Sequence, residues 1–156
     1  MHNSHSNGVH ILIVDDEPLV RRSLSELLTL SGYTVSTANN GREALEFLKD
    51  YNTDIIITDI KMPEIDGMQL LKQVKLANPN IAVILITGYG SIENAIEAIK
   101  EGAYDYVTKP IVDSEIKIVI DRLIKQRRLQ EENAKLKEQL AVSQKELFQD
   151  IVGKDE

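Results

Sequence analysis

Cysteine is absent from this chain of 156 residues, which excludes both a disulfide framework and a thiolate metal site. The absence suits a reducing compartment. No apolar run reaches the roughly 20 residues that cross a bilayer, and the polar residues 1–9 lack the apolar middle of a signal peptide. The sequence therefore predicts a soluble, cytoplasmic protein without membrane association, with a flexible tail at residues 1–8.

Basic side chains are in the minority, with 18 Lys and Arg against 25 Asp and Glu and a formal net charge of -7. Affinity for a nucleic-acid backbone comes from clustered Lys and Arg. We therefore do not expect this chain to bind nucleic acid directly. A hydrophobic content of 42% is enough for one compact domain with an appendage.

Short apolar runs alternate five times with segments of helical periodicity. The predicted strands cover residues 10–14, 33–38, 54–59, 81–87 and 104–108. The third and fourth runs are almost continuously apolar, as is typical of parallel strands covered on both faces. In the helix between the last two strands, one face is expected to carry Ile92, Ala95, Ile96 and Ile99. The pattern predicts an α/β fold, a doubly wound five-stranded parallel sheet with helices on both faces.

The stretch from about Ser114 to Gln149 contains no glycine or proline and predicts one long C-terminal helix. Its first part is apolar enough to cover the sheet, through Ile116, Val119, Ile120 and Leu123. Its second part has a heptad stripe, with Leu129 and Leu136 at d and Asn133, Leu140 and Leu147 at a. Ser143 takes the next d position, so the seam is imperfect. We expect a homodimeric coiled coil, and a single solvated helix is the alternative.

Polar residues follow four of the predicted strands at their carboxyl ends, where sites form in an open parallel sheet. Asp15 and Asp16 follow the first strand, and the third ends in Asp59. The fourth delivers Thr87 and the fifth Lys109. Two carboxylates about 4 Å apart repel by roughly 4 kcal/mol at an effective dielectric near 20. A raised pKa or a bound divalent cation relieves this repulsion, and oxygen ligands suit Mg²⁺ or Mn²⁺.

A phosphoryl group at Asp59 would suit these neighbours. A carboxylate can attack phosphorus when a metal neutralises the phosphoryl oxygens and the attack is in line. Thr87 would add a hydrogen bond and Lys109 a positive charge, so no general base is needed. Each residue also has an ordinary structural alternative, such as a helix cap for Asp16. Their joint placement at four strand ends favours a site.

The motifs resemble those of the receiver domain of bacterial two-component response regulators, which has a flavodoxin-like fold. The resemblance covers residues 9–123. It is carried by Val14–Glu17, Thr58–Pro63, Asp66–Gly67, Thr87–Gly88 and Tyr106–Pro110. It implies a phosphoprotein of a phosphorelay, whose partner is a sensor histidine kinase.

The resemblance also implies roles for the acidic residues. Asp59 would take the phosphoryl group from the kinase's phosphohistidine. Mg²⁺ would be held by Asp16, Asp59 and the backbone carbonyl of Lys61, with Asp15 acting through water. The chain would be a phosphoacceptor that assists its own phosphorylation and dephosphorylation, not an enzyme with a separate substrate.

A switch is implied as well. Thr87 and Lys109 would sense the phosphoryl group, and Tyr106 would swing inward when Thr87 moves. Relatives have a cis peptide before the corresponding proline, so we expect one between Lys109 and Pro110. The face formed by the 92–100 helix and the strand at Tyr106 is a second candidate surface for dimerisation.

The long charged helix followed by Leu147–Lys154 resembles the NtrC-like branch, in which the receiver controls a AAA+ ATPase acting on sigma-54 RNA polymerase. On this interpretation residues 9–124 form the receiver and 125–150 a coiled-coil linker. Residues 151–156 would begin the downstream AAA+ domain, and phosphorylation would alter dimerisation to regulate transcription. A receiver of another branch, or a pseudo-receiver that only binds proteins, remains the alternative.

Overall fold

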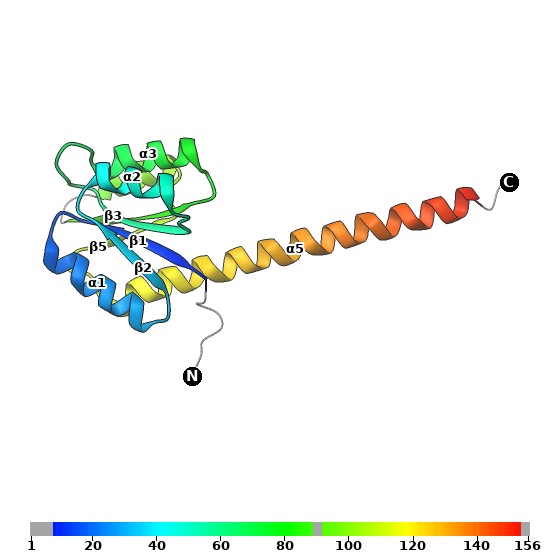
Figure 1. The fold of residues 1–156 in the computed structure, drawn as a ribbon, viewed down its shortest axis with the longest axis horizontal. Coiled ribbons are helices and arrows are strands. Elements are labelled where there is room, and N and C mark those ends of the chain that lie inside the picture. Colours follow the sequence, from blue (N-terminus) through cyan, green and yellow to red (C-terminus); the bar gives the residue numbers. More distant parts are fainter. Residues whose placement is uncertain (1–7, 89–91, 154–156) are drawn as a thin grey trace. The chain divides into compact units, whose positions relative to one another are not determined.

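A computed structural model of the chain describes residues 8–88 and 92–153. Within these residues strands and helices alternate strictly, as Figure 1 shows along its colour ramp. The elements are β1 (His10–Val14), α1 (Pro18–Leu30), β2 (Thr34–Ala38), α2 (Gly41–Asp50), β3 (Ile55–Asp59), α3 (Gly67–Ala77), β4 (Ala82–Thr87), α4 (Ile92–Lys100), β5 (Asp105–Thr108) and α5 (Asp113–Gly153). The tail expected at residues 1–8 lies outside the described residues except for Gly8.

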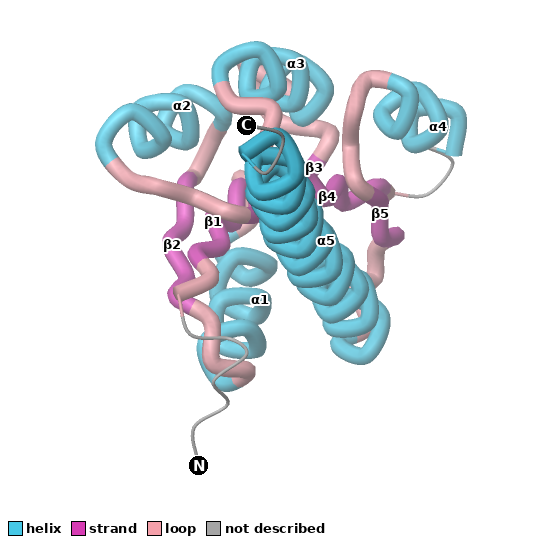
Figure 2. The backbone as a smooth tube through the Cα atoms, turned by 90° about the vertical axis from the view of Figure 1, so that its right-hand side faces the viewer, coloured by secondary structure: helices cyan, strands magenta, loops and turns pink. Residues whose placement is uncertain are grey.

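The strands form one parallel sheet in the order β2-β1-β3-β4-β5. The order reverses direction between β1 and β3, because the chain first moves outward to β2 and then returns across β1. In Figure 2, α2, α3 and α4 cover one face of the sheet and α1 lies on the other. The doubly wound α/β fold predicted from the sequence is confirmed.

The core is built on β3 and β4, every residue of which is buried. On one face, strand residues such as Leu12, Ile56 and Leu85 pack with Leu70 and Leu71 of α3 in a single apolar cluster. Such continuous burial explains why these strands show no apolar–polar alternation.

The face predicted for α4 is only partly correct. Ala95 and Ala98 are buried, whereas Ile96 and Ile99 are 52% and 42% exposed. The side chain of Ile92 is not described. The inward face of this helix is therefore formed by small alanines, and the larger isoleucines lie at the surface.

Local signals fix where two helices begin. The side chain of Asn40 accepts a hydrogen bond from the Glu43 N–H at 2.9 Å and caps α2. At α3, Asp66 and Gln69 form a reciprocal capping box. Gly67 follows, and a Cβ there would lie 2.7 Å from Ile60 Cα. The first turn of α3 can thus approach the end of β3 only because residue 67 is glycine.

The helix α5 runs over 41 residues without interruption, as predicted. It is buried in its first turns, at Ile116, Val119, Ile120 and Leu123. Residues 129–149 are all exposed, including the leucines of the heptad stripe. The chain divides into two compact units, Met1–Ile116 and Lys117–Glu156. No helix among the described residues has the length and apolar character needed to cross a membrane.

Candidate functional site

The register of the sheet brings the acidic residues together. Val14 at the end of β1 pairs with Thr58 of β3. Asp15 and Asp59 are the next residue on each chain segment, so both emerge at the same edge. Carboxylate oxygens of Asp15, Asp16, Glu17 and Asp59 all lie within 4.8 Å of one another. We call these four residues the acidic cluster.

The cluster has a buried half and an exposed half. Asp15 and Asp59 are 0% and 5% exposed, whereas Asp16 and Glu17 lie at the surface. Glu17 was not among the predicted site residues. The signal that could have found it is its position directly after the acid pair, in the turn that leads into α1.

Lys109 supplies positive charge to the cluster. Its Nζ donates hydrogen bonds to Asp59 Oδ2 at 2.8 Å and to Glu17 Oε1 at 3.2 Å, and lies 3.8 Å from Asp15 Oδ2. Burial by itself lowers the pKa of Lys109, but the hydrogen bonds to Asp59 and Glu17, with the charges of Asp15 and Asp59, raise it well above its ordinary value. Lys109 is therefore a permanent cation in the neutral pH range.

Asp15 is strained electrostatically. Its Oδ1 accepts a hydrogen bond from the Glu17 N–H at 2.8 Å, but its buried Oδ2 has no hydrogen-bond partner within the described part of the chain. Burial raises the pKa of Asp15 to about 6; the Glu17 N–H and the Lys109 charge oppose this, and the charges of Asp59 and Glu17 add to it. A buried carboxylate oxygen without a hydrogen-bond partner among the described residues is chemically suited to interact with a cation.

The residues around Asp59 hold its carboxylate in place. Oδ1 accepts a hydrogen bond from the Lys61 N–H at 3.1 Å, while Oδ2 is bonded to Lys109. The Thr58 hydroxyl donates to the Asp59 carbonyl at 3.1 Å. The Asp59 side chain is thus oriented from both oxygens. The Lys61 backbone reaches it through its N–H, and the role expected for the Lys61 carbonyl as a metal ligand stays a prediction.

The other predicted residues come from β4 and β5 and from the loop after β5. Thr87 ends β4, is 2% exposed, and its carbonyl accepts a hydrogen bond from the Lys109 N–H at 2.8 Å. The Lys109–Pro110 peptide is cis, which confirms that prediction. Tyr106 is half-buried on β5 and packs against the apolar cluster of the α2–α3–α4 face. Its switching role stays a prediction.

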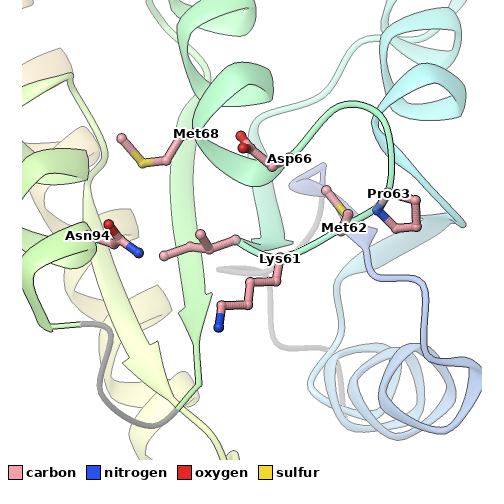
Figure 3. Close-up of a pocket in the computed structure, with 7 residues that line it drawn as sticks. Lys61, Met62, Pro63, Asp66, Met68 and Asn94 are labelled. Atoms are coloured by element: carbon pink, nitrogen blue, oxygen red, sulfur yellow. The ribbon is translucent and has the colours of Figure 1, made fainter.

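A separate cavity of about 480 Å³ lies next to the cluster. Figure 3 shows Met62 and Pro63 of the β3–α3 loop on one side, and Met68 of α3 and Asn94 of α4 on the other. Lys61 contributes its side chain to this cavity and its N–H to Asp59. The β3–α3 loop therefore connects the acidic cluster to the beginning of α4.

Comparison with known proteins shows which class this arrangement belongs to. Residues 11–121 match the response regulator receiver domain family. The chain therefore belongs to that family, whose members are signalling domains of two-component systems. The family's acidic pocket, which binds Mg²⁺, corresponds to the acidic cluster of this chain.

Several curated relatives, among them AtoC and DctD, are regulators of the NtrC-like branch. The chain is 41% identical over 133 residues to the regulatory protein AtoC of Escherichia coli, covering 85% of this chain and 29% of that protein. It is 36% identical over 126 residues to the C4-dicarboxylate transport regulator DctD of Rhizobium meliloti, covering 81% of this chain and 26% of DctD. The chain thus spans less than a third of these relatives.

Solved structures agree with this assignment. A receiver domain from Clostridium thermocellum has a TM-score of 0.73 and 39% identity, covering 78% of this chain and 98% of that one. NtrX from Brucella abortus has a TM-score of 0.77 and 32% identity, covering 81% of this chain and 29% of NtrX. The receiver fold of the chain is therefore established by sequence and by structure.

Proposed function

We propose that this chain is a phosphorylation-controlled switch in which Asp59 accepts a phosphoryl group from the phosphohistidine of a sensor histidine kinase. The observation that carries the proposal is the position of Lys109, whose ammonium is hydrogen-bonded to the Asp59 carboxylate at 2.8 Å. A fixed cation beside the nucleophile is suited to stabilising charge on a transferring phosphoryl group. Asp59 forms the new P–O bond as the P–N bond of the donor breaks.

The cluster fits a magnesium ion. Its donors are oxygen atoms within 4.8 Å of one another, and the orphaned Oδ2 of Asp15 lies among them. Asp16, Asp59 and the backbone carbonyl of Lys61 would hold the ion, with Asp15 acting through water. When bound, it would neutralise phosphoryl oxygens during in-line transfer.

Three other residues would respond to the phosphoryl group on Asp59. The Thr87 hydroxyl and the Lys109 ammonium would bind phosphoryl oxygens, and Tyr106 would move inward as Thr87 shifts. The half-buried position of Tyr106 on β5, three residues after the buried Ala103 and three before Lys109, supports a role in transmitting that shift. Phosphorylation of Asp59 would be coupled to the α4 and β5 surface because this surface has two alternative arrangements, and phosphorylation would shift the equilibrium between them.

The output would be a change in dimerisation. The exposed leucine stripe on residues 129–147 supports a coiled-coil homodimer through the linker, 125–150. The exposed Ile96 and Ile99 support a second pairing surface at α4 and β5. By analogy with the longer NtrC-like relatives, the receiver at 9–124 would control a AAA+ domain beginning near residues 151–156, and through it sigma-54-dependent transcription.

Phosphorylation by a small donor tests the central step. Acetyl phosphate with Mg²⁺ should label the wild-type chain, and both Asp59→Asn and removal of Mg²⁺ with a chelator should prevent labelling. Asp54→Asn is a matched control, because Asp54 lies outside the acidic cluster and its carboxylate accepts a hydrogen bond from the His10 N–H at 2.9 Å. Labelling of Asp59→Asn at the wild-type rate would refute the proposal.

A further inference from the structure

Glu17 differs from the other members of the acidic cluster in what it binds. Its Oε1 accepts a hydrogen bond from Lys109 Nζ at 3.2 Å, and its side chain is 59% exposed. The same ammonium is bonded to Asp59 Oδ2 at 2.8 Å. An ammonium has three N–H donors. Lys109 uses one of them for the nucleophile, Asp59, and another for Glu17, which has no part in the proposed transfer.

The charge of Glu17 opposes the arrival of a phosphoryl donor. Acyl phosphates are anions, and Glu17 lies at the exposed side of the cluster while Asp15 and Asp59 lie inside. The phosphoryl oxygens must also bind the Lys109 ammonium, and Glu17 competes with them because it already accepts a hydrogen bond from that ammonium. Coulomb's law gives the repulsion between Glu17 and one negative charge of the donor about 6 Å away, at the high effective dielectric of an exposed side chain. This repulsion corresponds to a reduction in rate of roughly three- to tenfold.

We propose that Glu17 is a specificity-determining residue that slows the reaction of Asp59 with free anionic acyl phosphates. This inference rests on the proposed function of Asp59. In the reaction with acetyl phosphate, a carboxylate oxygen of Asp59 forms a P–O bond, and acetate leaves with the electrons of the broken P–O bond, so no proton is required. A protein donor offsets the same repulsion with contacts elsewhere on the receiver, whereas a small donor has none.

The test compares rates of labelling by acetyl phosphate at saturating Mg²⁺, followed by intact mass. For each variant, the Mg²⁺ concentration that saturates the protein is first determined by calorimetric titration without acetyl phosphate. Differences in metal affinity between the variants therefore do not affect the comparison of rates. Glu17→Gln should react about three- to tenfold faster than wild type. Glu17→Asp, which keeps the charge, should stay closer to wild type. Glu26→Gln, an equal charge change at an exposed position of α1, should react at the wild-type rate.

Salt dependence separates this role from a structural one. Because an exposed charge is screened over about 8–10 Å at physiological ionic strength, the advantage of Glu17→Gln should shrink as salt is added. Glu17→Gln that reacts at or below the wild-type rate overturns the inference, as does an advantage that salt leaves unchanged. If wild type is labelled and Asp59→Asn is not, such a result leaves the proposed phosphoacceptor intact. A wild-type chain that is not labelled overturns both.

Discussion

Replacing Asp15 with asparagine should stabilise the metal-free protein at neutral pH. Asp15 is fully buried, and one of its carboxylate oxygens has no hydrogen-bond partner in the described residues. Burial raises its pKa from 3.8 to about 6. The folded state therefore binds the proton more tightly than the unfolded state does, and the associated stability is complete below about pH 4 and is lost as the pH rises through about 6.

The size of the effect follows from that shift. A change in pKa from 3.8 to about 6 corresponds to about 3 kcal/mol, since each pKa unit is worth 1.36 kcal/mol. Asparagine keeps an oxygen that can accept the Glu17 N–H, which now bonds Asp15 Oδ1 at 2.8 Å. It removes the charge that is costly to bury. About 3 kcal/mol is therefore the upper limit of the stabilisation of Asp15→Asn at pH 7.

Urea unfolding in a metal chelator, followed by circular dichroism, measures this effect directly. The advantage of Asp15→Asn over wild type should be present at about pH 7 and nearly absent at about pH 4. Asp16→Asn is the matched control, because Asp16 is exposed and should change the free energy of unfolding little. An Asp15→Asn variant no more stable than wild type at pH 7 would contradict the electrostatic account of the cluster.

Two further predictions concern packing and pairing. Gly67→Ala should destabilise the chain by about 1–3 kcal/mol in thermal or urea unfolding, because its Cβ would collide with Ile60 Cα. A Cβ at Gly88 meets nothing within 4 Å, so Gly88→Ala should be tolerated. Equal stability of the two variants would refute the steric argument. Leu136→Cys should form a disulfide-linked dimer, since d positions face each other in a parallel coiled coil and the chain has no other cysteine. Glu138→Cys, on the outer face, should not, and a wild-type chain that sediments as a monomer would rule out the linker dimer.

The fold could be predicted from the sequence because β3 and β4 are buried on both faces, and their residues are therefore almost continuously apolar. The sequence also predicted the gathering of Asp15, Asp59 and Lys109, because carboxyl ends of parallel strands meet at one edge. These features follow from local patterns and one topological rule. Element type and order could therefore be predicted, and the starts of β2 to β5 differ from the prediction by a single residue each.

Other features depend on contacts that no local pattern encodes. Glu17 binds Lys109, which lies 92 residues further along the chain. The requirement for Gly67 arises from the approach of α3 to the end of β3. In α4, helical spacing alone could not distinguish the buried Ala95 and Ala98 from the exposed Ile96 and Ile99, since all four are apolar. Each of these depends on how separate elements pack together.

Locating the phosphoryl group on the chain tests the central claim most directly. After reaction with acetyl phosphate and Mg²⁺, borohydride reduction converts an aspartyl phosphate to homoserine, and peptide mass spectrometry then identifies the residue. The account predicts homoserine at position 59 alone, with none in a sample treated with a metal chelator. Homoserine at Asp15 or Asp16 with Asp59 unmodified would contradict it.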